Sequence, residues 1–166
     1  MSPWILVVLA LAVLMVIAVL WKQVSRAGAI GFPYQPAKAL FTAAERSFLG
    51  VLDQAVGAEY RVFGKVRVAD LASVKSGLGR SARRGALNPI AAKHIDFVVC
   101  RASDLSVVCA VELNDRSHAS PRTQARDELL AKVCQTIGLP LFTVPAKQAY
   151  TVQEVRTSFT ATIKTH

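Results

Sequence analysis

The sequence is poor in acidic residues and in cysteine. It has 11 Asp and Glu against 20 Lys and Arg, which gives a formal net charge of +9 at pH 7. This balance favours polyanionic partners, either nucleic acid or the anionic face of a membrane. The three cysteines, Cys100, Cys109 and Cys134, have no C-x-x-C spacing and lie in apolar stretches. They are typical of core thiols in a reducing compartment, not of a disulfide framework or a zinc site.

No lysine or arginine precedes Trp4, where an unbroken apolar run begins that ends at Trp21. At about 1.5 Å per residue, this run crosses most of a hydrocarbon core of roughly 30 Å. A cleaved signal peptide is the alternative, but it usually carries positive charge before a shorter apolar stretch. Lys22 and Arg26 follow the run. We therefore expect residues 1–26 to be a single-pass anchor in a bacterial inner membrane, with the rest in the cytoplasm.

The remainder has the length of one domain and contains no internal repeat. Residues 27–38 are rich in Gly and Pro and read as a linker. Thr42 and Glu45 form a capping-box pattern that predicts a helix over 43–56, and an alternating pattern predicts a strand from Tyr60. Ser120 and the proline after it predict the start of a second helix, which a short strand over 139–144 follows. We expect the domain to span residues 39–157, followed by a frayed polar tail over 158–166.

Residues 73–93 contain no acidic residue and are rich in Gly, Ser, Ala and Arg. This composition predicts a mobile basic insertion that contacts phosphates, and a loop that only improves solubility is the alternative. The basic residues of the insertion are Lys75, Arg80, Arg83, Arg84 and Lys93.

Two apolar runs, 95–100 and 107–113, predict a β-hairpin in which Asp96 and Glu112 interrupt the apolar pattern. Pairing residue 98 with 110 and residue 100 with 108 places Asp96 opposite Glu112. Like charges at such positions repel each other, and a divalent cation, Mg²⁺ or Mn²⁺, would offset the repulsion. The alternative is that the two carboxylates cap strand ends or pair with Lys93 or Arg61.

This arrangement resembles the restriction-endonuclease-like superfamily, whose motif is written PD-(D/E)XK. More closely, it is similar to an uncharacterised bacterial family related to the very-short-patch-repair-like endonucleases, whose members are often attached to a membrane span. The segments that carry the resemblance are "EYRVFGKVRVADL", "KHIDFVVC", "VVCAVELNDRSH" and "RDELLAKVCQTIGLPLFTVPA". The resemblance implies an α/β fold with a restriction-endonuclease-like core of helix, mixed central sheet and helix, preceded here by one transmembrane helix.

The resemblance further implies that Glu45, Asp96 and Glu112 form an acidic metal site. Asn114 stands where the usual motif has a lysine, and it could still coordinate a metal through its carbonyl oxygen. Lys93 or Lys132 would then supply the missing cation, or His118 would act as general base. His118, Arg126 and Asp127 also lie within the motif, and Arg126 is a candidate phosphate contact. Without the resemblance, Glu45 has a simpler interpretation as the capping-box partner of Thr42.

The expected function is therefore that of a membrane-anchored nuclease that uses Mg²⁺ or Mn²⁺ to hydrolyse phosphodiester bonds. Its expected partners are the lipid bilayer and nucleic acid, with DNA as the first expectation, and no small-molecule cofactor is expected. Two alternatives stay open. One is a catalytically degenerate nucleic-acid tether, which Asn114 favours, and the other is an interaction protein at the membrane surface.

Overall fold

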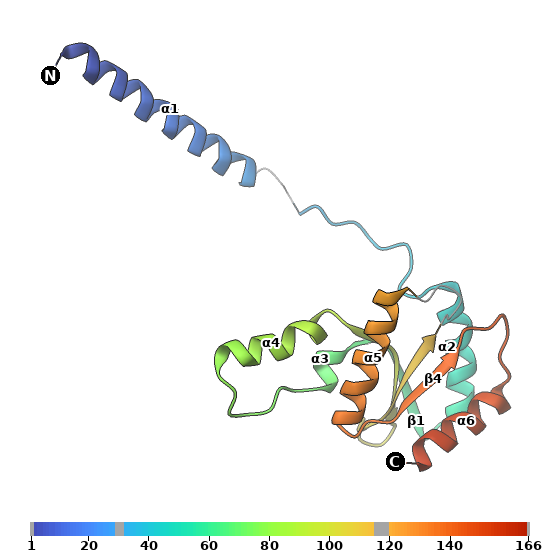
Figure 1. Ribbon diagram of the computed structural model, residues 1–166. Helices are drawn as coiled ribbons and strands as arrows, with labels where there is room; N and C mark the ends of the chain where they lie inside the picture. Colours follow the sequence, from blue (N-terminus) through green and yellow to red (C-terminus); the bar gives the residue numbers. More distant parts are fainter. Residues whose placement is uncertain (1, 29–31, 115–119, 166) are drawn as a thin grey trace. The chain divides into compact units, whose positions relative to one another are not determined.

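The computed structural model describes residues 2–28, 32–114 and 120–165, and the chain divides into two units, residues 1–40 and 41–166 (Figure 1). The first unit contains helix α1 (Pro3–Gly28). Its segment Pro3–Lys22 has 20 residues and a mean hydropathy of 3.0. The helix is thus long and apolar enough to cross a membrane, as the sequence predicted, although a signal sequence has the same properties. The type of membrane and the side of the domain stay predictions.

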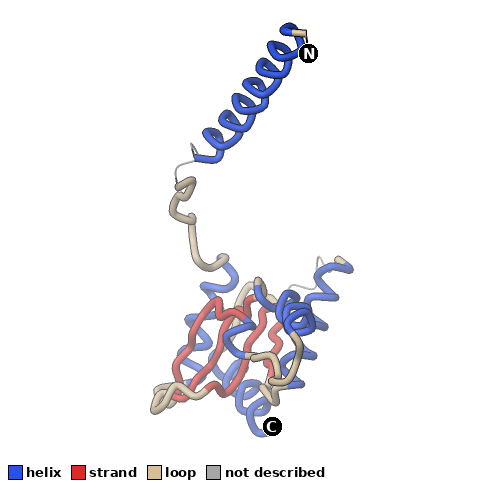
Figure 2. The backbone as a smooth tube through the Cα atoms, turned by 90° about the vertical axis from the view of Figure 1, so that its left-hand side faces the viewer, coloured by secondary structure: helices blue, strands red, loops and turns tan. Residues whose placement is uncertain are grey.

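The second unit is built on a four-stranded mixed sheet with the order β1-β2-β3-β4 (Figure 2). The strands are β1 (Tyr60–Arg67), β2 (His94–Arg101), β3 (Val107–Asn114) and β4 (Leu141–Pro145). β1, β2 and β3 are antiparallel neighbours, and β4 runs parallel to β3. A parallel pair needs a crossover connection, which contains helix α5 (Pro121–Thr136). The predicted mixed α/β class is confirmed.

Helices cover both faces of the sheet. Successive side chains of the buried strand β2 point to opposite faces, so they pack against different helices. Phe97 and Val99 belong to a core cluster shared with α2 (Ala43–Val56) and α6 (Val152–Lys164). Val98 and Cys100 belong to the opposite cluster, which contains residues of α3 (Val68–Leu71), α4 (Arg80–Ala91) and α5. Cys100, Cys109 and Cys134 are all buried and free, so the expectation of core thiols is confirmed.

The first residues of the second unit fix the start of α2 against the sheet. Phe41 stacks on Phe97, with ring centroids 5.7 Å apart. It lies over Gly64, where an added Cβ would come within 2.3 Å of the Phe41 ring. The predicted capping box is present, since the Thr42 hydroxyl accepts from the Glu45 N–H and the Glu45 carboxylate accepts from the Thr42 N–H. Helix α2 therefore begins at the predicted residue, Ala43, and the contacts of Phe41 fix this start against the sheet.

The prediction of a mobile basic insertion over residues 73–93 is corrected by the structure. It is not a mobile loop throughout, because it contains α4, with Pro89 inside that helix. Ile90 is 6% exposed and belongs to the core, which holds the helix against the domain although most of its surface is polar. A single buried residue in a basic, glycine-containing stretch gave too weak a periodicity to predict a helix.

The prediction of a frayed polar tail over residues 158–166 is also wrong, since helix α6 runs to Lys164. Phe159 is 3% exposed and packs edge-on against Tyr60, with ring centroids 5.4 Å apart. Arg156 adds a polar attachment, because its guanidinium donates to the carbonyls of Gln54 and Ala55 at the end of α2, both at 3.1 Å. The tail prediction failed because the many threonines concealed a narrow apolar stripe.

Because Phe159 belongs to the core, we expect Phe159→Ala to lower the free energy of unfolding by about 3 kcal/mol. Gln153→Ala, an exposed position on the same helix, should change it by less than about 0.5 kcal/mol. Urea-dependent proteolysis of the full chain in nanodiscs measures both values. Equal stability of the two variants would show that α6 does not complete the core.

Candidate functional site

The two predicted carboxylates meet where the β2–β3 ladder ends. Phe97 pairs with Val111 and Val98 with Ala110, so the expected pairing of 98 with 110 is confirmed. The expected pairing of 100 with 108 is wrong, since a bulge after Val99 pairs Cys100 with Val107. The bulge lies at the turn end of the hairpin and leaves the other end in the predicted register.

At that end, carboxylates replace backbone carbonyls as hydrogen-bond acceptors between the strands. The Asp96 N–H donates to Glu112 Oε1 at 3.1 Å, and the Leu113 N–H donates to Asp96 Oδ2 at 3.1 Å. Each carboxylate thus accepts from the backbone of the opposite strand. Asp96 and Glu112 are each 8% exposed, and hydrogen bonds of this kind offset the cost of burying their charges.

A cation also lies against each member of the pair. Lys65 Nζ is 3.2 Å from Asp96 Oδ1, and the Arg126 guanidinium is 3.0 Å from Glu112 Oε2. Lys65 comes from β1 and Arg126 from α5. Elements on both sides of the β2–β3 pair are therefore joined at this point by ionic contacts.

Glu45 joins the same cluster from α2. Its Oε1 accepts from Lys65 Nζ at 2.7 Å, while its Oε2 accepts from the Thr42 N–H at 2.9 Å. The capping role and a role at the site are thus both realised by one carboxylate. We call the five residues Glu45, Lys65, Asp96, Glu112 and Arg126 the acid–base cluster.

Lys65 is the member that sequence reasoning missed. The expected sources of a cation were Lys93 and Lys132, but neither makes an ion pair within the described part of the chain. In the alternating pattern of the strand, Lys65 falls on the same face as Arg61 and Phe63, which are exposed, so the sequence predicted that it faces solvent. Its backbone has φ of 56°, which is uncommon for a residue other than glycine, and the side chain is half-buried.

The signal for Lys65 lay in strand pairing. Gly64 pairs with Phe97 and Val66 with Ile95, so Lys65 lies across from Asp96. A prediction of this pairing, added to the hairpin, would have found the contact. The sequence gives no local cue for it, because β1 and β2 are separated by the whole basic insertion.

Protonation of the cluster follows from burial and charge. Burial raises the pKa of Glu112, and the neighbouring Asp96 charge adds to this rise, so the pKa reaches about 7 although Arg126 opposes the shift. Burial also disfavours charge on Glu45, but the hydrogen bonds from Lys65 and Thr42 and the positive charge of Lys65 together outweigh it and hold the pKa of Glu45 below its usual value. Burial lowers the pKa of Lys65, whereas its bonds to Glu45 and Asp96 raise it more, so the ammonium stays charged.

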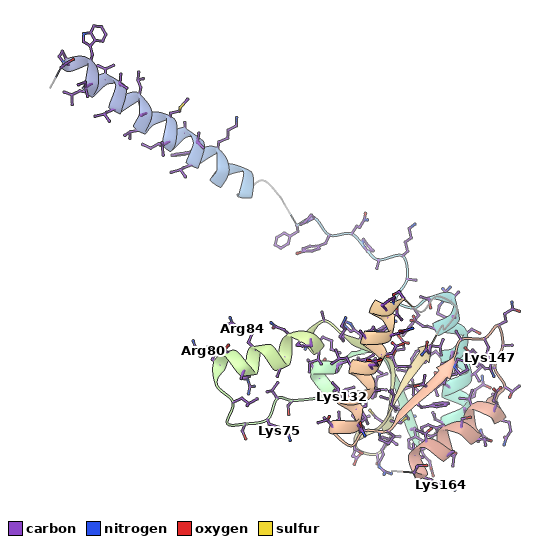
Figure 3. The ribbon with its side chains drawn as sticks, viewed as in Figure 1. Lys75, Arg80, Arg84, Lys132, Lys147 and Lys164 are labelled. Carbon is purple, nitrogen blue, oxygen red and sulfur yellow. The ribbon has the colours of Figure 1, made fainter. Side chains whose placement is uncertain are left out.

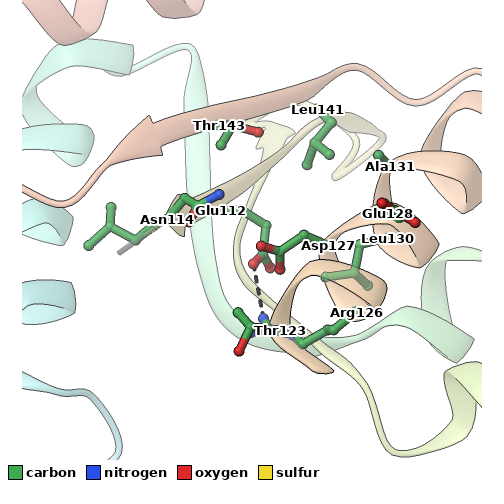
Figure 4. Close-up of a pocket in the computed structure, with 11 residues that line it drawn as sticks. Glu112, Asn114, Thr123, Arg126, Asp127, Glu128, Leu130, Ala131, Leu141 and Thr143 are labelled. Carbon is green, nitrogen blue, oxygen red and sulfur yellow. Dashed lines mark hydrogen bonds and ion pairs between the residues drawn. The ribbon is translucent and has the colours of Figure 1, made fainter. Parts of the chain in front are cut away.

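A cavity of about 460 Å³ opens beside Glu112, where the end of β3, strand β4 and helix α5 meet (Figure 4). Asn114, Thr123, Arg126 and Asp127 are among the residues that line it, and the figure shows Arg126 paired with Glu112. Asn114 is half-buried at the end of β3, and it lines the same cavity as Glu112. His118 lies outside the described residues.

The other predicted contacts are not part of this cluster. Lys75, Arg80, Arg83 and Arg84 are exposed on α4 and the segment before it, and Lys93 is half-buried just before β2. Figure 3 shows Arg80 and Arg84 on the surface of α4. Within residues 2–28, 32–114 and 120–165, no group of three or more His, Cys, Asp or Glu is arranged to hold a metal ion. Glu45 contacts Lys65 within the cluster, and its place in a metal site with Asp96 and Glu112 stays a prediction.

These features define a mixed α/β domain in which an acid–base cluster with buried carboxylates lies at the end of two central strands. The comparison with protein families assigns it more narrowly. Residues 37–163 match the family described as "Protein of unknown function (DUF2726)", and the chain belongs to this family. No curated protein and no solved structure matches the chain.

The raised pKa of Glu112 predicts a pH dependence of stability. Between pH 4.5 and about 7 the folded chain binds a proton at Glu112 that the unfolded chain has lost, so stability falls as the pH rises through this window. We expect this carboxyl to account for a loss of about 3 kcal/mol. Urea-dependent proteolysis of the full chain at a series of pH values measures it.

The matched variants are Glu112→Gln and Glu154→Gln. The first removes the titrating group and should flatten the profile between pH 4.5 and about 7. The second changes an exposed glutamate on α6 and should leave the slope of the parent protein. A profile that keeps its slope in Glu112→Gln would show that Glu112 titrates at the usual pH for a carboxyl.

Proposed function

We propose that this domain is a nuclease of the restriction-endonuclease-like type, which hydrolyses nucleic-acid phosphodiester bonds with a divalent cation. The buried pair Asp96 and Glu112, with a lysine ammonium 3.2 Å from the aspartate, carries the proposal. Paired carboxylates beside a lysine are what metal-assisted phosphodiester hydrolysis needs, since the former bind the metal and the latter offsets charge on the phosphate.

The donor set fits Mg²⁺ or Mn²⁺. Such ions take one or two carboxylates and complete their shell with water and substrate phosphate. Asp96 and Glu112 would supply the carboxylates, and the amide oxygen of Asn114, in the same cavity as Glu112, would be a further oxygen donor. When bound, the cation would polarise the phosphoryl group and lower the pKa of a bound water. Glu112 would release its proton on binding, because a ligating carboxyl must be ionised.

Lys65 would take the place of the lysine that the motif has at the position of Asn114. The resemblance expects a lysine two positions after Glu112, on β3. Here Lys65, on β1, brings an ammonium to Asp96 instead. We assign to it the role of stabilising negative charge that develops on the phosphate during hydrolysis. Glu45, 2.7 Å from the same ammonium, holds Lys65 in place.

Substrate binding would depend on basic side chains that contact phosphates without reading the base sequence. Arg126 borders the cavity beside Glu112, and Arg80, Arg83 and Arg84 are exposed on α4. Helix α1 would tether the domain to a bacterial inner membrane. Lys22 follows the apolar run, so the domain would lie on the cytoplasmic side.

A nucleic-acid tether without catalysis is the second candidate, and one observation favours it. Each of the four oxygens of Asp96 and Glu112 already accepts a hydrogen bond from the protein. The cluster is thus satisfied without a metal, and its ionic contacts alone would stabilise the sheet. The two candidates share the basic surface and differ in metal binding and cleavage.

Cleavage assays distinguish the two candidates. We expect the full chain in nanodiscs to cleave DNA or RNA when Mg²⁺ or Mn²⁺ is present. Asp96→Asn and Glu112→Gln should each lower the rate by about 100-fold or more. Glu59→Gln, at an exposed position, should leave it unchanged. Lys65→Met should lose cleavage while it still binds the metal, as followed by heat of binding.

A parent protein that binds nucleic acid but neither binds the metal nor cleaves would support the tether. Cleavage at the parent rate by Glu112→Gln would overturn the assignment of the site in either case.

The basic surface of α4 predicts salt-dependent binding. Replacing Arg80, Arg83 and Arg84 together by Ala should weaken binding to all sequences alike. It should also reduce the slope of log K against log salt by about 0.9 for each duplex phosphate that the variant no longer neutralises. In the control variant, Lys147 and Lys164, which are exposed elsewhere on the domain, are replaced by Ala (Figure 3). This variant should keep the slope of the parent protein. Fluorescence anisotropy in zwitterionic nanodiscs measures the slopes, and equal slopes would remove α4 from the interface.

A further inference from the structure

A second cavity, of about 510 Å³, lies between α5 and the segment that leads into and includes α4. The acid–base cluster contributes no residue to its lining. Its volume is that of a typical small-molecule pocket, about 300 to 1,000 Å³. The apolar residues that line it include Leu78, Ala86, Ile90, Leu129, Val133 and Ile137.

The apolar lining of this cavity is only partly covered by the protein. Leu78 and Ile137 are 48% and 39% exposed, although both are large aliphatic residues. Ile90, at the base, is 6% exposed and belongs to the core. Apolar surface therefore continues from the core out to solvent, and its removal from water would favour binding of an apolar ligand.

Charge at the cavity is of one sign. Lys75 and Lys132 contribute to the lining, and none of the described lining residues is acidic. Neither lysine makes an ion pair within the part of the chain that the structure describes. Hydroxyls of Ser73 and Ser76 add hydrogen-bond donors. An apolar space with cations and donors at its border fits a ligand with a hydrocarbon body and an anionic end.

We propose that this cavity binds a long-chain fatty acid, with the hydrocarbon chain between α4 and α5 and the carboxylate held by Lys75 and Lys132. Charge complementarity selects an anion over a neutral or cationic amphiphile. The exposed arginines of α4 would draw anions toward the opening. A helix in the same chain that is long and apolar enough to enter a bilayer would keep the domain near a source of acyl chains.

Photolabelling of the full chain in phosphatidylcholine nanodiscs tests the proposal. The probe is a palmitic acid with a diazirine in its chain, and the matched probe is the amine with the same chain and diazirine. We expect the acid to label peptides from residues 72–90 and 129–137 about tenfold more than the amine. Equal labelling of these peptides by the two probes, or labelling confined to residues 3–28, would overturn the proposal.

Matched substitutions locate the ligand in the cavity. Ala86→Trp places an indole in the cavity from an exposed position of α4, whereas Ala82→Trp, also exposed on α4, lies outside the lining. Labelling by the acid should fall about tenfold in the first and stay at the parent level in the second. Equal labelling of the two variants would overturn the proposal.

A charge reversal at one of the two lining lysines gives an independent readout. Lys132→Glu should reduce labelling by the acid and bring it to the level of the amine, while the exposed Lys164→Glu should not change it. Melting curves of all variants check that they fold. Complete loss of labelling on addition of a duplex oligonucleotide would mean that nucleic acid occupies this surface, which also overturns the proposal.

Discussion

The reciprocal hydrogen bonds between Asp96 and Glu112 and the backbone of their opposite strands are the constraint on which this site depends. Each carboxylate takes the place of a carbonyl where the β2–β3 ladder stops, and each is 8% exposed. Two buried like charges repel, so the fold must surround them with donors and cations. The positions of Lys65 and Arg126 follow from that need. Removing either cation would leave a buried carboxylate without its partner.

The acid–base cluster thereby joins elements that lie far apart in the chain. Lys65 connects β1 to Glu45 at the start of α2, and Arg126 connects α5 to Glu112. The two hydrophobic cores set the faces of the sheet, whereas these ionic contacts align the strand ends with a helix on each face. A carboxyl with a pKa of about 7 in this setting is half-protonated near neutral pH, which makes its charge sensitive to a bound cation.

The surface around α4 differs from the acid–base cluster in the exposure of its charges. The acid–base cluster pairs buried carboxylates with half-buried cations, but the arginines of α4 are exposed and the adjoining cavity is apolar. Paired charges of the first kind hold side chains in fixed positions, and exposed charges of the second kind attract anions over a distance. The excess of 20 basic over 11 acidic residues thus has a local origin in part, because residues 73–93 contribute cations and no acid.

Local patterns in the sequence determined the apolar helix, the capping box of α2, the hairpin with Asp96 opposite Glu112, and the buried thiols, since each depends on residues close in the chain or on simple periodicity. They did not determine that α6 completes the core or that Ile90 holds α4, because one or two buried side chains per helix leave a weak period. Only the tertiary structure decided the contact of Lys65 with Asp96. That contact requires β1 to pair with β2 across the whole insertion, and pairing over such a separation is decided by packing of the complete sheet.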